Sequence, residues 1–432
     1  MRLLNHDTDS QRVRDTTDSG SSKTTGDKKM STISRGRMRA VLVGCACIFA
    51  IAIAPSSTFA EANASDAPVA KPELYAELDA AGVGGITQLG NGQIVIGYHP
   101  FYSPTVQVAL LNRDRKSTTP YPSTEWQSCK NPDGSWKKEF DHCLDWVLGL
   151  HTDSKGILWM LDSAKSVDKA SGRPAGLVPK LVGWNTRRNK LERIIRITDE
   201  ATVTESQHND FVVDAKHNVI VVADEAIGED SKGTGDKAAL VIVDLATGKS
   251  RRLLQGHPSV QPVKDPIRWD QGTSTAGTFA LHVGVDGIAL DHRSEWLYFA
   301  PLSGYKMYRI RMSDLLDRKL DATQLGAKVQ TYADKPFNGG LSIDQDNNLY
   351  LTEVGERAIG IIPPDTRKYR RLVADPDMVW PDGVTYNSDG HMYTGAAQLT
   401  LTSALQADGI AKNKAPYRVY RFKPLAAGQP GF

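Results

Sequence analysis

The sequence has few cysteines, almost no excess of charge of either sign, and no apolar run long enough to cross a membrane comfortably. Four of its 432 residues are cysteine, and 52 basic residues face 50 acidic ones, which gives a formal charge of +2. This balance offers no electrostatic case for binding nucleic acid or an acidic membrane surface. Long helical periodicity is absent too. Abundant Gly and Pro and a 7% aromatic content are typical of a loop-rich β protein.

Several catalytic motifs are also missing. The sequence contains no Gly-x-Ser-x-Gly elbow, no phosphate-binding loop, no His-Glu-x-x-His pair and no dinucleotide-binding fingerprint. Serine hydrolase, kinase and zinc protease chemistry therefore has no support in the sequence.

The first 60 residues differ in composition from the rest. Met1–Lys29 is polar and rich in Ser, Thr and Asp, and we expect it to be disordered because it has little apolar surface to bury. Three arginines then precede the apolar run Ala40–Ala54, and small residues follow it. This order is typical of a secretory signal peptide. We expect a secreted or periplasmic protein, cleaved near Ala60 to Ala64, that touches the membrane only through this signal or an uncleaved anchor.

Two cysteines, Cys129 and Cys143, fall in the mature region, residues 61–432. Disulfides persist in exported proteins, so we expect these two to be bridged. A bridge over a loop of this length would stabilise the fold by about 3 kcal/mol in the chain-entropy model. The alternative is two free, half-buried thiols.

The mature region repeats one unit: a short apolar strand, a turn of Asp, Asn, Gly or Lys, and a second apolar strand. The six copies fall within residues 85–96, 148–162, 210–224, 287–299, 340–352 and 383–394. A third strand, and usually a fourth, follows most copies. Four strands per unit, repeated about six times, predict an all-β fold: a single six-bladed β-propeller with four-stranded antiparallel blades. We expect it to be a monomer.

Segments within these repeats resemble one known family. Leu158–Asp162, Leu240–Asp244 and above all Leu297–Ser303 (Leu-Tyr-Phe-Ala-Pro-Leu-Ser) resemble the yellow / major royal jelly protein family, and the resemblance covers most of Leu74–Phe422. It implies a six-bladed propeller of a bacterial type. Because the family includes dopachrome-converting enzymes and amine-binding salivary proteins, it also implies that a small molecule, an aromatic one among the options, is bound or isomerised at the channel mouth. No catalytic residue carries over from this resemblance.

A second family shares the architecture, the calcium-dependent lactonases of the gluconolactonase / regucalcin type. Pro381–Val384 and Phe337–Leu341 resemble two of its ligand segments, which implies bound Ca²⁺ and lactone hydrolysis. However, Gly84–Ile86 stands where the family's first-blade Glu is expected. A non-enzymatic ligand-binding protein of the cell envelope is the third hypothesis.

The inner strands of a propeller all start at one end of the channel, so residues just before them should converge on its axis. These positions hold His208, Asn209 and Asp210 in one strand, and Asp286, Asn338 and Asp382 in three others. Carboxylate and amide oxygens suit Ca²⁺, which makes Asn209, Asp286, Asn338 and Asp382 candidate metal ligands. Alternatively, Asp382 and Asp286 act as catalytic acid or base, while Asn209 and Asn338 bind the ligand. Each residue could also merely cap a turn.

Other acidic residues have weaker claims to the site. Second strands are followed by further acidic residues that we expect at the channel mouth: Asp162, Asp224, Glu225 and Glu353, of which Asp162 and Glu353 are the candidate ligand-binding residues. Four more stand at the hairpin turns, where we expect them only to hold the backbone: Asp153, Asp214, Asp291 and Asp344.

Overall fold

The computed structural model describes residues 69–431, apart from 166–173, 199, 229–233, 270–271, 274–280 and 407. The expected N-terminal extension, signal segment and cleavage site lie outside the described residues. Within the described part, no helix is both long enough and apolar enough to cross a membrane.

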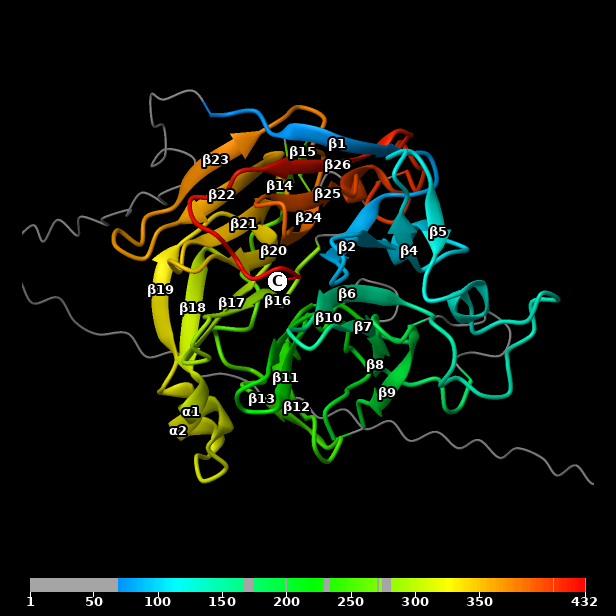
Figure 1. Ribbon diagram of the computed structural model, residues 1–432. Helices are drawn as coiled ribbons and strands as arrows, with labels where there is room; N and C mark the ends of the chain where they lie inside the picture. The colour runs from blue at the N-terminus through cyan, green and yellow to red at the C-terminus, as the bar shows by residue number, and fades with distance from the viewer. Residues whose placement is uncertain are drawn as a thin grey trace, which may run out of the picture. The chain divides into compact units, whose positions relative to one another are not determined.

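Six four-stranded antiparallel sheets are arranged as blades around a central channel (Figure 1). Each innermost strand packs against the innermost strands of both neighbouring blades, which closes the ring. In blade order they are β2 (Val83–Gln88), β6 (Val147–Thr152), β10 (His208–Asp214), β16 (Val285–Leu290), β20 (Asn338–Ile343) and β24 (Pro381–Tyr386). They correspond to the first strands of the six repeats, so the predicted six-bladed propeller is confirmed.

The outer strands follow in sequence within each of the first five blades. In the first three blades they are β3 (Ile94–Tyr98), β4 (Val108–Leu111) and β5 (Thr118–Pro120); β7 (Ile157–Asp162), β8 (Lys180–Asn185) and β9 (Lys190–Arg196); and β11 (Val219–Asp224), β12 (Ala239–Asp244) and β13 (Ser250–Leu253). In the next two they are β17 (Trp296–Pro301), β18 (Lys306–Arg311) and β19 (Gln330–Asp334); and β21 (Leu349–Glu353), β22 (Ala358–Ile362) and β23 (Arg370–Ala374).

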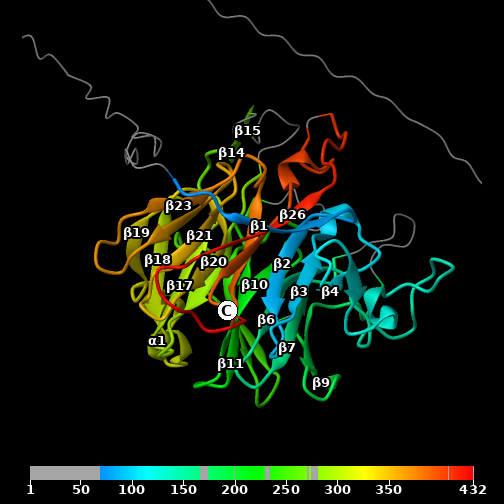
Figure 2. The same cartoon turned by 45° about the horizontal axis from the view of Figure 1, so that its top comes forward.

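The sixth blade closes the ring with a strand from the start of the fold. Its sheet order is β24, β25 (Met392–Ala396), β26 (Tyr417–Phe422) and β1 (Glu73–Leu78), so the first described strand is the outermost one. Figure 2 shows β1 lying along β26. This pairing joins residues about 340 positions apart and ties the two ends of the propeller together.

A few short elements lie outside the blades. They are a two-stranded ribbon, β14 (Arg268–Trp269) and β15 (Gly272–Thr273); two helices, α1 (Met312–Leu316) and α2 (Ala322–Gly326); and the 3-10 turns Pro100–Tyr102, Thr124–Gln127 and Leu399–Leu401.

The hydrophobic core lies between the blades, because each blade packs against a neighbouring blade on both of its faces. All six residues of β11 are buried, as a strand with apolar side chains on both faces requires. Phe211 and Val222 of the third blade pack in one cluster with Trp159 and Leu181 of the second. The hairpin turns are held as expected: Asp153 Oδ1 accepts hydrogen bonds from two backbone N–H groups of its own turn, each at 2.9 Å.

The same irregularity recurs in every inner strand and shapes the channel. The pairing of each inner strand with the next strand shifts between its first and fourth residues. The third residue is glycine in five blades, where a Cβ would approach the adjoining blade's backbone carbonyl oxygen to 2.5–2.8 Å: Gly85, Gly149, Gly287, Gly340 and Gly383. The blades therefore meet backbone to backbone at this end of the channel. In the third blade the position is Asp210.

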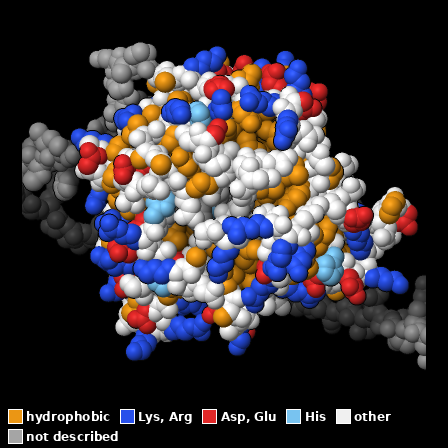
Figure 3. All heavy atoms as spheres, in the orientation of Figure 1, with side chains coloured by type: hydrophobic (Ala, Val, Ile, Leu, Met, Phe, Trp, Pro, Cys, Tyr) orange, Lys and Arg blue, Asp and Glu red, His pale blue; other side chains and the backbone are white. Residues whose placement is uncertain are grey.

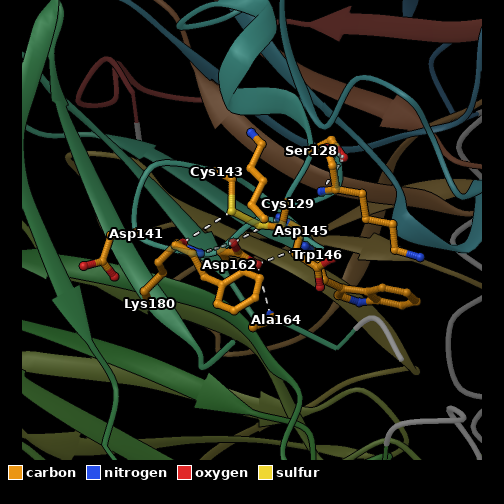
Figure 4. Close-up of a disulfide and its surroundings, with 12 residues drawn as sticks. Ser128, Cys129, Asp141, Cys143, Asp145, Trp146, Asp162, Ala164 and Lys180 are labelled. Atoms are coloured by element: carbon orange, nitrogen blue, oxygen red, sulfur yellow. Dashed lines mark hydrogen bonds and ion pairs between the residues drawn. A yellow bond between two sulfur atoms is a disulfide. The ribbon is translucent and has the colours of Figure 1, made fainter. Parts of the chain in front are cut away.

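Cys129 and Cys143 form the predicted disulfide, which is confirmed with Cα atoms 5.0 Å apart. The bridge is buried against Phe140, Ala164 and Leu177. Figure 4 shows that it lies close to the start of β6 and the end of β7. It thus fixes the long loop that leads into the second blade.

Candidate functional site

A small cavity lies on the channel axis at the end where the inner strands begin. Its volume is about 40 Å³, and all six blades line it, through residues that include Gly84, Leu148, Asp210, Asp286, Gly340 and Asp382. A buried water needs roughly 10–15 Å³ by this measure. The cavity therefore holds a few waters or one ion, and an organic ligand has to sit at its mouth.

Two carboxyl groups and one amide form the inner part of the site. Asn209, the second residue of β10, donates from Nδ2 to Asp286 Oδ1 at 2.5 Å and to Glu225 Oε1 at 3.1 Å. Asp286 is the second residue of β16, and Glu225 directly follows β11. Asp286 and Glu225 are both buried. The amide thus bridges two carboxyl groups from neighbouring blades.

Asp210 and Asp382 form the outer part of the site. Both line the cavity, and each keeps some accessible surface even though it lies deep in the fold, because it faces the channel. Asp210 Oδ1 accepts a hydrogen bond from the N–H of Phe211 at 2.8 Å. These two carboxyl groups are the ones that a ligand at the mouth can reach.

Burial raises the pKa of all four carboxyl groups. It raises the pKa of Asp210 to about 8 and that of Asp286 to about 7, and the Asp286 charge adds to the rise at Asp210. The pKa values of Glu225 and Asp382 rise well above their ordinary range, chiefly through burial and then through the Asp286 charge. Four ionised carboxylates would repel one another here. The site therefore favours retained protons or a bound cation.

Two buried lysines stand behind the carboxyl groups. Lys335 Nζ donates to the carbonyl oxygens of Pro301 at 2.9 Å and Gly304 at 2.6 Å. Burial lowers the pKa of Lys335 to about 7, while the Asp286 charge and these acceptors favour its ammonium form. Lys165 donates to Gln207, which in turn donates to Glu225. Both cations act on the inner carboxyl pair, lowering the pKa of Asp286 and of Glu225 against the effect of burial.

The structure brings three of the four predicted axial residues together. Asn209, Asp286 and Asp382 line the cavity, but Asn338 does not. Asn338 is fully buried and its Nδ2 donates to the carbonyl of Gly339 at 2.9 Å; its Oδ1 has no hydrogen-bond partner in the described structure. Asn338 is the first residue of β20, one position before the place that Asn209, Asp286 and Asp382 hold in their strands.

Asp162 and Glu353 lie away from the cavity, and each carboxylate is hydrogen-bonded to other groups of the protein. Asp162 accepts hydrogen bonds from the N–H of Trp146 and of Ala164, each at 2.9 Å, and from Lys180 Nζ at 2.7 Å (Figure 4). Glu353 accepts from Arg371 Nε at 3.0 Å and from the Tyr369 hydroxyl. Neither side chain lines the cavity. Their contacts tie loops and outer strands together.

The fold and site can now be set against known proteins. The family model for major royal jelly protein matches residues 147–424. The chain belongs to the major royal jelly protein family. Major royal jelly protein 9 of Apis mellifera is 22% identical over 250 residues, which are 56% of this chain and 52% of the bee protein. The chain therefore matches about half the length of this curated relative.

Solved propellers resemble this royal jelly family member over most of its length. A luciferin-regenerating enzyme has a TM-score of 0.50 at 15% identity, covering 83% of this chain and 97% of its own. A gluconolactonase of Xanthomonas campestris has a TM-score of 0.48 at 10% identity, covering 83% and 98%. At 15% identity the first likeness concerns the fold alone.

Sequence reasoning about this royal jelly family member missed most of the charged groups behind the cavity. Lys165 and Lys335 have no spacing that marks them, since only tertiary packing buries them. Asp210 did carry a signal: it stands where the other five inner strands have glycine. The sequence placed Asp210 beside Asn209 at the channel end, and aligning the six repeats on that third position distinguishes it from its neighbours.

Proposed function

We propose that this protein binds a small molecule at the channel mouth and moves a proton on it through the cavity carboxyl groups. One observation carries the proposal: four carboxyl groups with raised pKa values meet at one end of the channel, and Asp382 and Asp210 face the opening. A carboxyl group whose pKa is raised is a stronger base than an ordinary one, and it can both take up and release a proton. That is the requirement for isomerising a carbonyl compound.

The proposed step is a tautomerisation with no net oxidation. Ionised Asp382 accepts the proton from a carbon beside a ligand carbonyl; the C–H bond breaks, an O–H bond forms on the carboxylate, and the electron pair moves toward the carbonyl oxygen. The same carboxyl then returns the proton to another atom of the ligand. Asp210, when protonated, donates a hydrogen bond to the developing oxyanion. Asp286 is the second candidate acid or base, behind these two.

A substitution series tests this proposal. Purified protein would be screened against dopachrome and other enolisable carbonyl compounds by absorbance. Asp382→Ala should lower any activity found by about 100-fold or more, the range expected for loss of a general acid or base. Asp365→Ala, at an exposed turn of the fifth blade, is the matched control and should leave the activity unchanged. Full activity in Asp382→Ala would contradict the assignment.

A calcium-dependent lactonase is the second candidate function. Two features favour it: Asn209 and Asp286 approach to 2.5 Å across neighbouring blades, and the cavity has room for an ion. The all-oxygen donor set of Asp286, Asp382, Asp210 and Asn209 suits a hard cation. Among the described residues, however, no three His, Cys, Asp or Glu side chains converge closely enough to hold a metal. A cation would need amide, backbone or water oxygens as well, and would polarise a lactone carbonyl.

Metal analysis separates the two candidates. For the lactonase, the mature protein should contain about one equivalent of calcium, and EDTA should abolish hydrolysis of a lactone such as gluconolactone. Asp286→Asn should then lose both metal and activity. For the isomerase, EDTA should leave the activity unchanged. If the protein carries neither activity, it acts as a binding protein alone.

Export is the second part of the proposal. The basic and apolar N-terminal composition supports it, and the disulfide suits an oxidising compartment. N-terminal sequencing of protein recovered from the medium or periplasm should find a new terminus near Ala60 to Ala64. Recovery from the cell interior with residues 1–60 intact would contradict export.

A further inference from the structure

The last described residues return across the channel at the end opposite the carboxyl groups. After β26, the segment Lys423–Gly431 leaves the sixth blade and crosses the turn ends of the inner strands. Figure 1 shows this red trace ending over the centre of the ring, and Figure 3 shows the same face with mostly uncharged atoms at its centre. No blade strand includes these residues.

The first half of the segment is bonded to the fifth blade. The N–H of Leu425 donates to the Tyr350 hydroxyl at 2.7 Å, and that of Ala426 donates to Asp344 Oδ2 at 3.2 Å. The N–H of Gln345 donates back to the carbonyl of Ala427 at 2.8 Å. Asp344 and Gly428 pair as an isolated antiparallel bridge. The contacts thus fix the backbone of the segment.

The second half reaches three more blades. The N–H of Gly431 donates to the carbonyl of Tyr386 in the sixth blade at 3.0 Å. The Thr87 hydroxyl of the first blade donates to the carbonyl of Gly431 at 3.2 Å in a buried hydrogen bond. Gly431 also lies against the carbonyl of Thr152 in the second blade. The segment therefore spans four of the six inner strands.

The sequence of the segment fits this close approach. A Cβ on Gly428 would lie 2.6 Å from Cγ of Tyr386, and one on Gly431 would lie 2.6 Å from the carbonyl oxygen of Thr152. Gly431 also has a φ of +94°, which favours glycine. Two glycines at the two closest contacts let the chain lie flat against the channel end.

We propose that residues Lys423–Gly431 form an internal plug that closes the turn end of the channel, so that the carboxyl cavity opens at one mouth alone. The cavity reaches down to His151 and Thr385, next to the Thr152 and Tyr386 contacts of the plug. At the turn end of the channel, the part of the ring between the second and fourth blades holds a hollow of about 220 Å³. Gln429 of the plug lines this hollow. This inference concerns channel access and does not depend on the proposed ligand or chemistry.

Hydrogen exchange followed by mass spectrometry tests the plug in two variants of the full fold. One chain ends at Phe422, the last residue of β26, and the other carries Gly431→Val, which introduces the Cβ clash and strains the backbone. The control is Gly409→Val, since Gly409 has a φ of +65° but no atom within 4 Å of its Cβ position. Both glycines have a positive φ that strains a valine, so the control accounts for backbone strain of this kind and the comparison reports the loss of plug contacts.

Both plug variants should exchange at least tenfold faster in peptides covering the ends of β2, β6, β20 and β24, while β8 and β12 keep the wild-type rate. Gly409→Val should match the wild type in all of them. Unchanged exchange in the plug variants would overturn the proposal. A rise spread evenly over all six blades would also overturn it, because the segment would then stabilise the fold without controlling access. If the shortened chain does not fold, Gly431→Val decides the question.

Discussion

Asp210 breaks the regularity of the ring at the residue scale. Five inner strands place glycine at this position because the adjoining blade's backbone leaves no room for a side chain. The third blade instead places a carboxyl group there, on the cavity wall. A buried carboxyl is costly unless it keeps its proton or meets a cation. Because Asp210 replaces the glycine of the other five repeats at a cost to folding, we expect this carboxyl group to serve the function of the protein.

The raised pKa of Asp210 predicts how stability depends on pH. Its pKa is about 8 in the fold against an ordinary value of 3.8. Below about pH 4 both the folded and the unfolded chain hold the proton, so the group does not lower the free energy of unfolding. As the pH rises to about 8 only the unfolded chain releases the proton readily, and the free energy of unfolding falls.

Asp210→Asn removes this penalty and keeps the oxygen that accepts from Phe211. In EDTA, the variant should match the wild type near pH 4 and exceed it near pH 8 by on the order of 5 kcal/mol, since the pKa rises by about four units and each unit corresponds to about 1.4 kcal/mol. Urea unfolding at several pH values measures this. A difference that stays constant from pH 4 to 8 would show that Asp210 ionises normally.

The buried pair of Asp162 and Lys180 gives a second prediction at this scale. Both side chains are almost fully buried, and they meet at 2.7 Å. Lys180→Met should lower the free energy of unfolding by about 3–5 kcal/mol, because it leaves an unpaired buried carboxylate. Adding Asp162→Asn should recover part of the loss. If Lys180→Met instead changed ligand binding at unchanged stability, Asp162 would belong to the site after all.

At the scale of elements, local sequence predicted the hairpins because their signals lie within about fifteen residues. The copy at 148–162 contains β6 and β7 almost entirely, and the Asp at its turn does bond that turn. The outermost strand of the sixth blade was not predicted. β1 has an ordinary alternating pattern, and nothing near it in the sequence indicates that β26, about 340 positions on, is its partner.

The loop held by the disulfide is an element whose stability can be measured. Its cysteines are 14 positions apart, and Leu144 to Trp146 lead from it directly into β6. Replacing both cysteines with serine should lower the free energy of unfolding by about 3 kcal/mol in the chain-entropy model. Reductant should produce a similar loss in the wild type and none in the double variant. Equal stability of wild type and double variant in oxidising buffer would refute the estimate.

At the scale of the whole molecule, symmetry made part of the site predictable. Asn209, Asp286 and Asp382 hold equivalent places in repeated strands, so a ring brings them together whatever their neighbours are. Asn338 comes one residue earlier in its strand than these three do in theirs, and that offset keeps it off the cavity wall. Glu225 was expected near the channel mouth because it follows a second strand, but Lys165 and Lys335 follow no such rule. Their places depend on how loops from different blades pack, which one sequence does not encode locally.

Closure of the ring is also a property of the whole molecule, and β1 tests it. Ala76 and Leu78 of β1 share a buried cluster with Val419 of β26 and Ile86 of the first blade, so β1 joins the two ends of the ring.

A chain that begins at residue 80 lacks this strand and leaves β26 as an exposed edge, which favours aggregation. A chain that begins at residue 69 keeps it. The longer chain should therefore be monomeric in size-exclusion chromatography, with a sharp thermal transition, while the shorter one should aggregate or melt at least 10 °C lower. A monomeric shorter chain with the same midpoint would mean that contacts between the inner strands close the ring without β1.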